Sequence, residues 1–349
     1  MRKGSTGSST ICRSGHEELL VLAPNWLGDA VMATPFLFAL RERFPAAAIT
    51  LFSREYPAEL YRRSPAIDSL AEYRGDMLAR LAAVRRIRPA YGFDACFVLP
   101  PSVSAAVTSV FSNARRRIGY GDRWRRACLT DAVPAGLHRD GHLSRSYMRL
   151  LERFAGCAVP DLPLPSVTPE TIWPERVEAI VGRREYFVLA PGAAYGAAKA
   201  WPGERYGALA RMLVNRTGWT AVVVGQQEDH GLACEIIDGV GALGKNLAGE
   251  LSLADLISVL RGARLAIGND SGPVHIAAAL GVATVAVFGP TSVDWTSPRG
   301  IAVRIIKSEI DCAPCFKREC PRGAPECLVG VEAERVFDAA TSLIEEGKL

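Results

Sequence analysis

Short apolar runs alternate with amphipathic stretches along most of the chain. The apolar runs predict buried strands, and the amphipathic stretches carry the period of a helix. Because strand and helix alternate in this way in parallel α/β layers, the sequence predicts an α/β fold. The expected strands are 19–23, 48–52, 93–99, 117–119, 186–190, 220–224, 264–267 and 284–288, and the expected helices are 30–44, 56–63, 77–87, 104–111, 142–154, 204–217, 253–261 and 332–345.

Prolines and a repeated tetrapeptide divide the chain into two halves. Five prolines lie between residues 160 and 174, which predicts a linker. The tetrapeptide Val-Leu-Ala-Pro stands at the end of the first predicted strand of each half, at residues 21–24 and 188–191. We therefore expect two similar domains that face each other across a cleft. The expected divisions are a disordered leader at 1–18, a first domain at 19–165, a second domain at 175–330, and a C-terminal helix within 331–349 that packs back toward the first domain.

Residues 268–279 form the most informative stretch of the chain. They lie between two predicted strands and begin a helix that ends near Gly281. Unpaired N–H groups at such a helix start form a seat for an anion, most usefully a diphosphate. Asp270, Ser271 and Gly272 lie at this start, and His275 lies about one turn inside. The alternative is that Asp270 and Ser271 only cap the helix and that His275 is an ordinary partly buried histidine.

Other polar residues follow predicted strands in both halves. Lys199 could bring a point charge to a diphosphate, and the carboxylate of Glu228 or Asp229 could bind ribose hydroxyls. Across the expected cleft, Asp29 could accept a proton from an acceptor hydroxyl, or it could cap a helix. The chain lacks the Gly-x-Gly-x-x-Gly fingerprint after the first strand of each half, and it lacks a P-loop, a His-Glu-x-x-His and a Gly-x-Ser-x-Gly motif. Nicotinamide dehydrogenases are therefore disfavoured.

The distribution of charge and the length of the apolar stretches limit the kinds of molecule that we expect the protein to bind. The net charge is only +4, but arginines outnumber acidic residues twofold between residues 54 and 126, which favours an anionic partner. Nucleic acid is not expected, because few aromatic residues lie among these arginines. No apolar stretch reaches the ~20 residues that span a membrane, and residues 1–18 lack the apolar core of a secretory signal. The sequence predicts a cytoplasmic protein.

A cysteine cluster near the C-terminus has two interpretations. Its members are Cys312, Cys315, Cys320 and Cys327, with prolines between them. The spacing could ligate a structural zinc ion or an iron–sulfur cluster. The alternative is a loop of reduced thiols that could also form a strained disulfide.

Several separated motifs, in order along the chain, resemble glycosyltransferase family 9, the heptosyltransferases. The resemblance covers the chain from about residue 19 to its end. The matching segments are Pro-Asn-Trp-Leu-Gly-Asp-Ala-Val-Met at 24–32, Pro-Gly-Ala-x-x-Gly-x-x-Lys-x-Trp-Pro at 191–202, Asn-Leu-Ala-Gly at 246–249, Asn-Asp-Ser-Gly-Pro-x-His-x-Ala-Ala-Ala at 269–279 and Phe-Gly-Pro at 288–290.

This resemblance implies a GT-B type fold of two Rossmann-like domains around a deep cleft, with the acceptor on the first domain and ADP-heptose on the second. It implies inverting transfer of heptose to the heptose of the lipopolysaccharide inner core, on a Kdo2-lipid A acceptor, without a catalytic metal or other cofactor. The arginine-rich first half suits such an acceptor, and it also suits peripheral contact with the anionic cytoplasmic face of the inner membrane. Asp29 would be the general base. The donor-binding residues would be Lys199, Glu228 or Asp229, Leu251, Asp270, Ser271, Gly272 and His275.

Two alternatives stay open. The first is another sugar-nucleotide transferase of the family, with a different acceptor or donor. The second is a non-catalytic nucleotide-binding protein that kept the fold, and the presence of both Asp29 and Lys199 counts against it.

Overall fold

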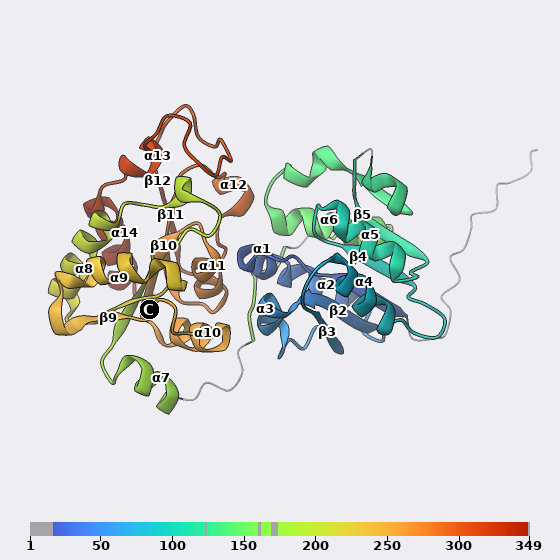
Figure 1. The fold of residues 1–349 in the computed structure, drawn as a ribbon, viewed down its shortest axis with the longest axis horizontal. Helices are drawn as coiled ribbons and strands as arrows, with labels where there is room; N and C mark the ends of the chain where they lie inside the picture. The colour runs from blue at the N-terminus through green and yellow to red at the C-terminus, as the bar shows by residue number, and fades with distance from the viewer. Residues whose placement is uncertain (1–16, 123, 160–161, 169–173, 348–349) are drawn as a thin grey trace, which may run out of the picture.

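A computed structural model describes residues 17–347 except 123, 160–161 and 169–173. It contains two six-stranded sheets, one in each half, and neighbouring strands are parallel throughout (Figure 1). The α/β fold with two Rossmann-like halves is confirmed. The first sheet has the order β3-β2-β1-β4-β5-β6, and the second has the order β12-β11-β10-β7-β8-β9. The strands are β1 Glu18–Leu22, β2 Ala48–Arg54, β3 Ser69–Tyr73, β4 Ala95–Val98, β5 Arg116–Gly121, β6 Asp131–Pro134, β7 Tyr186–Ala190, β8 Thr220–Val223, β9 Gly244–Asn246, β10 Leu265–Asn269, β11 Ala283–Phe288 and β12 Val303–Lys307.

Helices connect the strands and cover the sheets. The helices of the first half are α1 Leu27–Met32, α2 Thr34–Arg43, α3 Glu55–Ala58, η1 Glu59–Tyr61, α4 Met77–Arg86, α5 Val103–Phe111, η2 Arg125–Cys128, η3 Ala135–Arg139 and α6 Leu143–Ala155. Those of the second half are α7 Pro174–Val181, η4 Ala197–Lys199, α8 Gly203–Thr217, η5 Gln227–Asp229, α9 His230–Asp238, η6 Gly241–Leu243, α10 Leu253–Gly262, α11 Gly272–Ala279, α12 Val293–Thr296, α13 Glu326–Val329 and α14 Ala333–Glu345.

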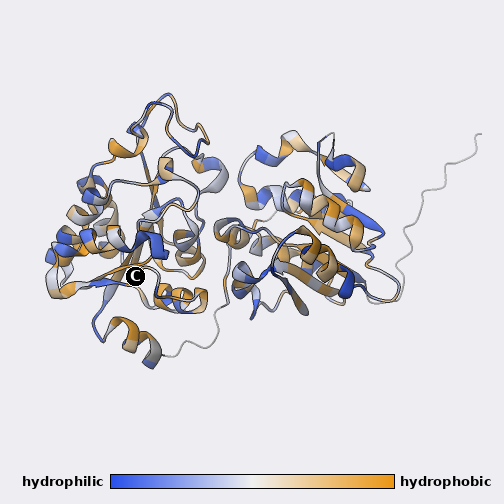
Figure 2. Ribbon diagram, in the orientation of Figure 1, coloured by the Kyte–Doolittle hydropathy of each residue, from blue (hydrophilic) through white to orange (hydrophobic). Residues whose placement is uncertain are grey.

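The central strands are apolar along their length because layers of helix cover both faces of each sheet. Leu19, Leu20, Val21 and Leu22 of β1 are all fully buried between β2 and β4. Figure 2 shows the same hydrophobic character in the inner strands of the second sheet. This is why the sequence pattern located these strands.

The four strands that the pattern missed are the four sheet edges: β3, β6, β9 and β12. Edge strands have neighbours on one side only, so their side chains are mixed and partly exposed. The predicted helix 30–44 is divided into α1 and α2 at Ala33, and Pro35 lies in the first turn of α2. Proline fits there because the N–H that it lacks would have no partner within the helix.

The ends of the chain compare with the expected divisions as follows. Most of the predicted leader lies outside the described residues, but Glu18 begins β1. The proline-rich linker also lies partly outside them. Helix α14 packs against α8 and β11 of the second half, whereas the sequence suggested packing toward the first. No helix in the described part of the chain is long and apolar enough to cross a membrane.

The two halves meet through α1 and α11, which lie side by side between the sheets (Figure 1). Further contacts join η3 and α6 to the loop around α12. The Arg139 guanidinium lies 4.8 Å from both the Trp295 and the Phe316 ring centres, and His142 Nε2 lies 2.9 Å from the Ser297 carbonyl oxygen. The carboxyl ends of β1 and β10 therefore face one another, with α1 and α11 between them.

Candidate active site

Asp29 lies in the first turn of the short helix α1, directly after the carboxyl end of β1. Its surroundings raise its pKa from an ordinary value of 3.8 to about 6. Burial is the main cause; His275 and Lys199 act in the opposite direction, and Asp270 adds to the rise. A carboxylate with a pKa close to neutrality has the properties of a general base. Since these three partners all belong to the second half, Asp29 faces the other side of the cleft.

A buried carboxylate organises that other side. Lys199 Nζ donates hydrogen bonds of 2.6 Å to Asp270 Oδ2 and 3.1 Å to the Asp270 carbonyl oxygen. Thr291 Oγ1 donates to Asp270 Oδ2 at 2.7 Å. Burial opposes ionisation of Asp270, but His275 and Lys199 outweigh it and hold the pKa of the carboxyl well below its usual range. Asp270 is therefore ionised, and it fixes Lys199 with at least one ammonium N–H free for a ligand.

His275 links this network to α1. Its Nε2 lies 3.3 Å from Asp270 Oδ1, and its ring packs against Gly28, where an added Cβ would lie 3.0 Å from the His275 Cδ2. An added Cβ at Gly272 would lie 2.7 Å from the Leu27 Cβ. Two glycines therefore allow α1 and α11 to approach closely enough for Asp29 to reach the donor side.

The start of α11 offers unused hydrogen-bonding groups. Ser271 is the residue that precedes the helix, but its hydroxyl makes no capping hydrogen bond. The Ser271 Oγ is buried and has no partner among the described residues. A buried hydroxyl without a partner costs free energy, and a bound ligand would remove that cost. Together with the N–H groups of Gly272 and its successors, this favours an anion.

The structure separates the two candidate ribose ligands. Asp229 Oδ2 accepts a 2.8 Å hydrogen bond from the Gln226 N–H, and its carboxylate lies against Gly192 and Gly225. Asp229 thus stabilises the turn after β8. Glu228 lies beside it with an exposed side chain. Leu251 is partly buried in the loop before α10, and no described contact connects it to Asp29, Lys199 or Asp270.

Sequence reasoning gave no role to four residues that support the site. Thr291 and Thr296 donate to Asp270, and Tyr195 lies with its ring 4.8 Å from Lys199 Nζ. Asn269, fully buried, accepts from the Trp201 N–H and the Tyr206 hydroxyl and donates to the Pro191 carbonyl oxygen at 2.6 Å. Thr291 and Tyr195 both follow carboxyl ends of strands, which was the signal that could have identified them.

The loop that contains Cys312, Cys315, Cys320 and Cys327, which we call the cysteine loop, packs against the turn that carries Lys199. All four of its thiols are free and line one cavity of about 230 Å³. No group of three or more His, Cys, Asp or Glu residues in the described chain is placed to hold a metal ion, so the metal interpretation gains no support. The loop backbone instead accepts from the Ala198 N–H at the Arg318 oxygen, 3.0 Å away, and from the Tyr195 hydroxyl at the Phe316 oxygen, 2.7 Å away.

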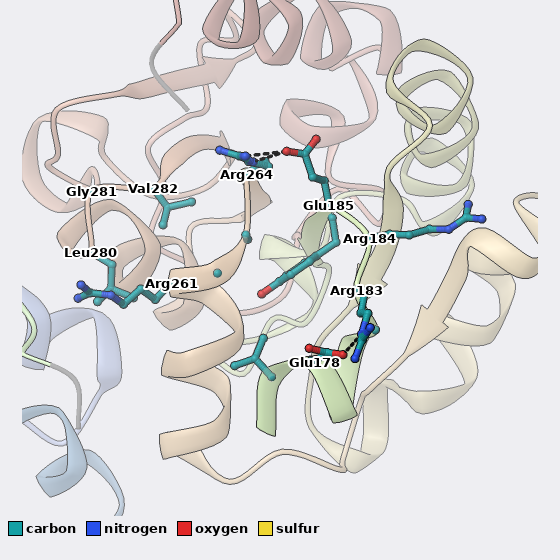
Figure 3. Close-up of a pocket in the computed structure, with 14 residues that line it drawn as sticks. Glu178, Arg183, Arg184, Glu185, Arg261, Arg264, Leu280, Gly281 and Val282 are labelled. Carbon is teal, nitrogen blue, oxygen red and sulfur yellow. Dashed lines mark hydrogen bonds and ion pairs between the residues drawn. The ribbon is translucent and has the colours of Figure 1, made fainter. Parts of the chain in front are cut away.

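A larger pocket, of about 740 Å³, lies elsewhere (Figure 3). It borders the starts of β7, β10 and β11, at the edge of the second sheet opposite the donor side. Two of its arginines are neutralised, since Arg264 pairs with Glu185 and Arg183 with Glu178. Size alone therefore does not identify the site.

Comparisons with known proteins agree with this geometry. A family model described as glycosyltransferase family 9 (heptosyltransferase) matches residues 80–324. The chain is 28% identical to lipopolysaccharide heptosyltransferase 2 of Salmonella typhimurium, over 94% of this chain and 99% of the relative.

Two solved structures share the fold over the whole chain. The E. coli ADP-heptose lps heptosyltransferase II has a TM-score of 0.81 at 25% identity, with 95% of this chain and 100% of that chain covered. A glycosyl transferase family 9 protein from Veillonella parvula has a TM-score of 0.82 at 22% identity, with 95% and 97% covered. The expected GT-B type architecture is thereby confirmed, and the chain belongs to glycosyltransferase family 9, the heptosyltransferases.

Proposed function

We propose that this glycosyltransferase moves L-glycero-D-manno-heptose from ADP-heptose to the heptose of the lipopolysaccharide inner core, with Asp29 as the general base. The observation that carries the proposal is a carboxylate of raised pKa opposite a cationic, N–H-lined seat on the other half. Relatives that cover nearly the whole chain support it, since they are named lipopolysaccharide heptosyltransferase 2 in Salmonella typhimurium and E. coli, and a solved structure of the same fold is that of an ADP-heptose lps heptosyltransferase II. The heptose acceptor is the one that the family resemblance implies.

The donor would lie along the carboxyl edge of the second sheet. The diphosphate would accept from Lys199, from the Ser271 hydroxyl and from the N–H groups at the start of α11, beginning with Gly272. Glu228 would bind the ribose, and Leu251 would line the adenine pocket. Asp270 and His275 would hold Lys199 and the helix start in place, because their polar atoms already bind one another.

In the transfer step, the acceptor hydroxyl gives its proton to Asp29 as its oxygen bonds to the anomeric carbon. The bond from that carbon to the diphosphate breaks at the same time, and ADP leaves with the electron pair. Lys199 and the helix start stabilise the negative charge that develops on ADP. Attack from the side opposite the leaving group inverts the anomeric configuration.

The direct test is product formation from ADP-heptose with a panel of truncated core acceptors. Transfer to an acceptor that already carries one heptose is the expected result. Transfer only to an acceptor without heptose would instead indicate a heptosyltransferase I. Binding of ADP-heptose without transfer to any acceptor would contradict the proposal.

A further inference from the structure

Arg318 of the cysteine loop lies beside the turn that carries Lys199. Its guanidinium carbon is 5.4 Å from the centre of the Tyr195 ring, and Lys199 Nζ is 4.8 Å from the centre of the same ring. The ring attracts both groups because the face of an aromatic ring carries partial negative charge. Two cations from distant parts of the sequence therefore lie around one side chain, in the turn that follows β7.

Backbone contacts fix the position of Arg318. Its carbonyl oxygen accepts a 3.0 Å hydrogen bond from the Ala198 N–H. Just before it in the loop, the Phe316 carbonyl oxygen accepts a 2.7 Å hydrogen bond from the Tyr195 hydroxyl. A glycine allows this approach, since an added Cβ at Gly196 would lie 2.5 Å from the Arg318 carbonyl oxygen. The loop is therefore packed against this turn along its backbone.

The charge of Lys199 is balanced by a carboxylate, whereas that of Arg318 is not. Lys199 Nζ lies 2.6 Å from Oδ2 of the ionised Asp270, so this pair brings no net charge to a ligand. Arg318 is exposed and forms an ion pair with no carboxylate of the described residues. Its guanidinium also keeps its proton at any working pH. Arg318 therefore supplies uncompensated positive charge beside the anion seat.

We infer that Arg318 binds the diphosphate of the donor as a second cation, and that it stabilises ADP as ADP leaves. The inference rests on the proposed function and adds a residue to its donor site. Each phosphate of the donor carries a negative charge, and a guanidinium can donate to two phosphate oxygens at once. Lys199 acts beside it as a point charge.

The charge of the diphosphate changes during transfer, which gives Arg318 a part in the rate. When the bond from the anomeric carbon to the diphosphate breaks, the electron pair stays on an oxygen of the terminal phosphate of ADP. This phosphate thereby gains a negative charge that it lacks in bound ADP-heptose. A cation beside it binds the departing ADP more tightly than the donor, and this difference lowers the barrier to transfer.

Lys317 provides a matched control, because it carries the same charge in the same loop. It is exposed, but it lines the cavity that contains the four thiols and makes no contact with the Tyr195 ring. If Arg318 only packed on Tyr195, its loss would change stability and leave phosphate binding as it is. If Arg318 only added to the overall charge, the loss of Lys317 would have the same effect.

Calorimetric titration of the full-length protein with ADP and with AMP tests the inference. Arg318→Gln should weaken ADP binding about tenfold, the scale of hydrogen bonds to a charged group. It should bind AMP, which lacks the second phosphate, like the wild type. Lys317→Gln should bind both nucleotides like the wild type, and Arg318→Lys should recover part of the ADP affinity. In the transfer assay, kcat of Arg318→Gln should fall at least about tenfold.

An ADP affinity of Arg318→Gln equal to that of the wild type would overturn the inference. An equal loss of affinity for ADP and AMP would do so too, and so would the same loss in Lys317→Gln. Heptose transfer by the wild type reports separately on the proposed function. A wild type that binds ADP through Arg318 but transfers no heptose to any acceptor would contradict that function and leave the role of Arg318 in phosphate binding intact.

Discussion

At the scale of single residues, the site is a contrast between two carboxylates. Asp270 is surrounded by donors from Lys199, His275 and Thr291, which favour its ionised form. Asp29 has no such donors in the described structure, and its ionised form is disfavoured by burial. Two environments therefore give two roles to the same chemical group, a fixed charge and a proton acceptor.

The raised pKa of Asp29 predicts that replacing this residue stabilises the folded protein, by an amount that depends on pH. Above pH 6 the Asp29 carboxyl is ionised in both the folded protein and the unfolded chain. Its ionisation costs more free energy in the folded protein, because its pKa there is about 6, whereas the ordinary value of 3.8 applies to the unfolded chain. The variant Asp29→Asn should therefore raise the free energy of unfolding by up to about 3 kcal/mol at pH 8. The gain should shrink as pH falls from 6 toward 3.8, and it should vanish below about pH 3, where the carboxyl is protonated in both states. Denaturant unfolding at several pH values checks this, with Glu228→Gln as the control; a gain independent of pH would contradict it.

The unpartnered Ser271 hydroxyl predicts a loss of ligand binding without a loss of stability. Because its Oγ is buried and bonds to nothing in the described structure, Ser271→Ala should not lower the melting temperature of the free protein and should raise it slightly. It should weaken ADP binding about tenfold, the scale of a hydrogen bond to a charged group. Ser308→Ala removes another buried, unpartnered hydroxyl outside the site; it should affect the melting temperature in the same direction but leave ADP affinity unchanged. Calorimetric titration with ADP measures the affinity. An affinity in Ser271→Ala equal to that of the wild type would show that Ser271 does not bind the donor.

At the scale of elements, the site depends on how closely α1 and α11 approach. Their contact has no room for a side chain at Gly272. The pattern of apolar and polar positions along the chain could predict α11 and most of the strands, because the buried central strands are uniformly apolar. It could not predict the edge strands, whose mixed burial resembles that of loops.

Gly272→Ala should push α1 and α11 apart and move Asp29 away from the donor. We expect kcat/KM to fall at least about tenfold, since small misplacements of reacting groups are costly. ADP affinity should change less, because Gly272 contributes to the donor seat through its N–H, which alanine keeps. Leu27→Gly removes all three Leu27 atoms that the new Cβ would meet, including the Leu27 Cβ at 2.7 Å, so the double variant should recover most of the activity. Failure of this rescue, with both variants folded, would contradict the steric explanation.

At the scale of the whole molecule, a pair of cation–π contacts joins the two halves away from the reacting groups. Arg139 of the first half approaches both Trp295 and Phe316 of the second, at 4.8 Å from each ring centre. The Phe316 carbonyl oxygen in turn accepts from Tyr195, whose ring lies beside Lys199. The contact between the halves and the position of Lys199 are thus linked through Phe316 and Tyr195. Sequence alone could not predict this connection, because its members come from four separate segments.

Loss of Arg139 should loosen the arrangement of the halves without unfolding either. Each cation–π contact contributes about 1 kcal/mol, so Arg139→Ala should shift the molecule toward more open forms. Small-angle X-ray scattering should then give a larger radius of gyration than that of the wild type. Arg85→Ala removes a comparable contact with Phe111 inside the first half and should leave the scattering unchanged. Identical curves for the two variants would show that Arg139 does not join the halves.

The central claim, that Asp29 is the base opposite the donor seat, is tested most directly by comparing turnover with donor binding in Asp29→Asn. The substitution preserves the size of the side chain and removes its ability to take a proton. We predict that transfer from ADP-heptose falls by about 10²–10⁴-fold, the contribution of a positioned general base. ADP affinity should stay close to that of the wild type. Transfer at a near wild-type rate would contradict the account.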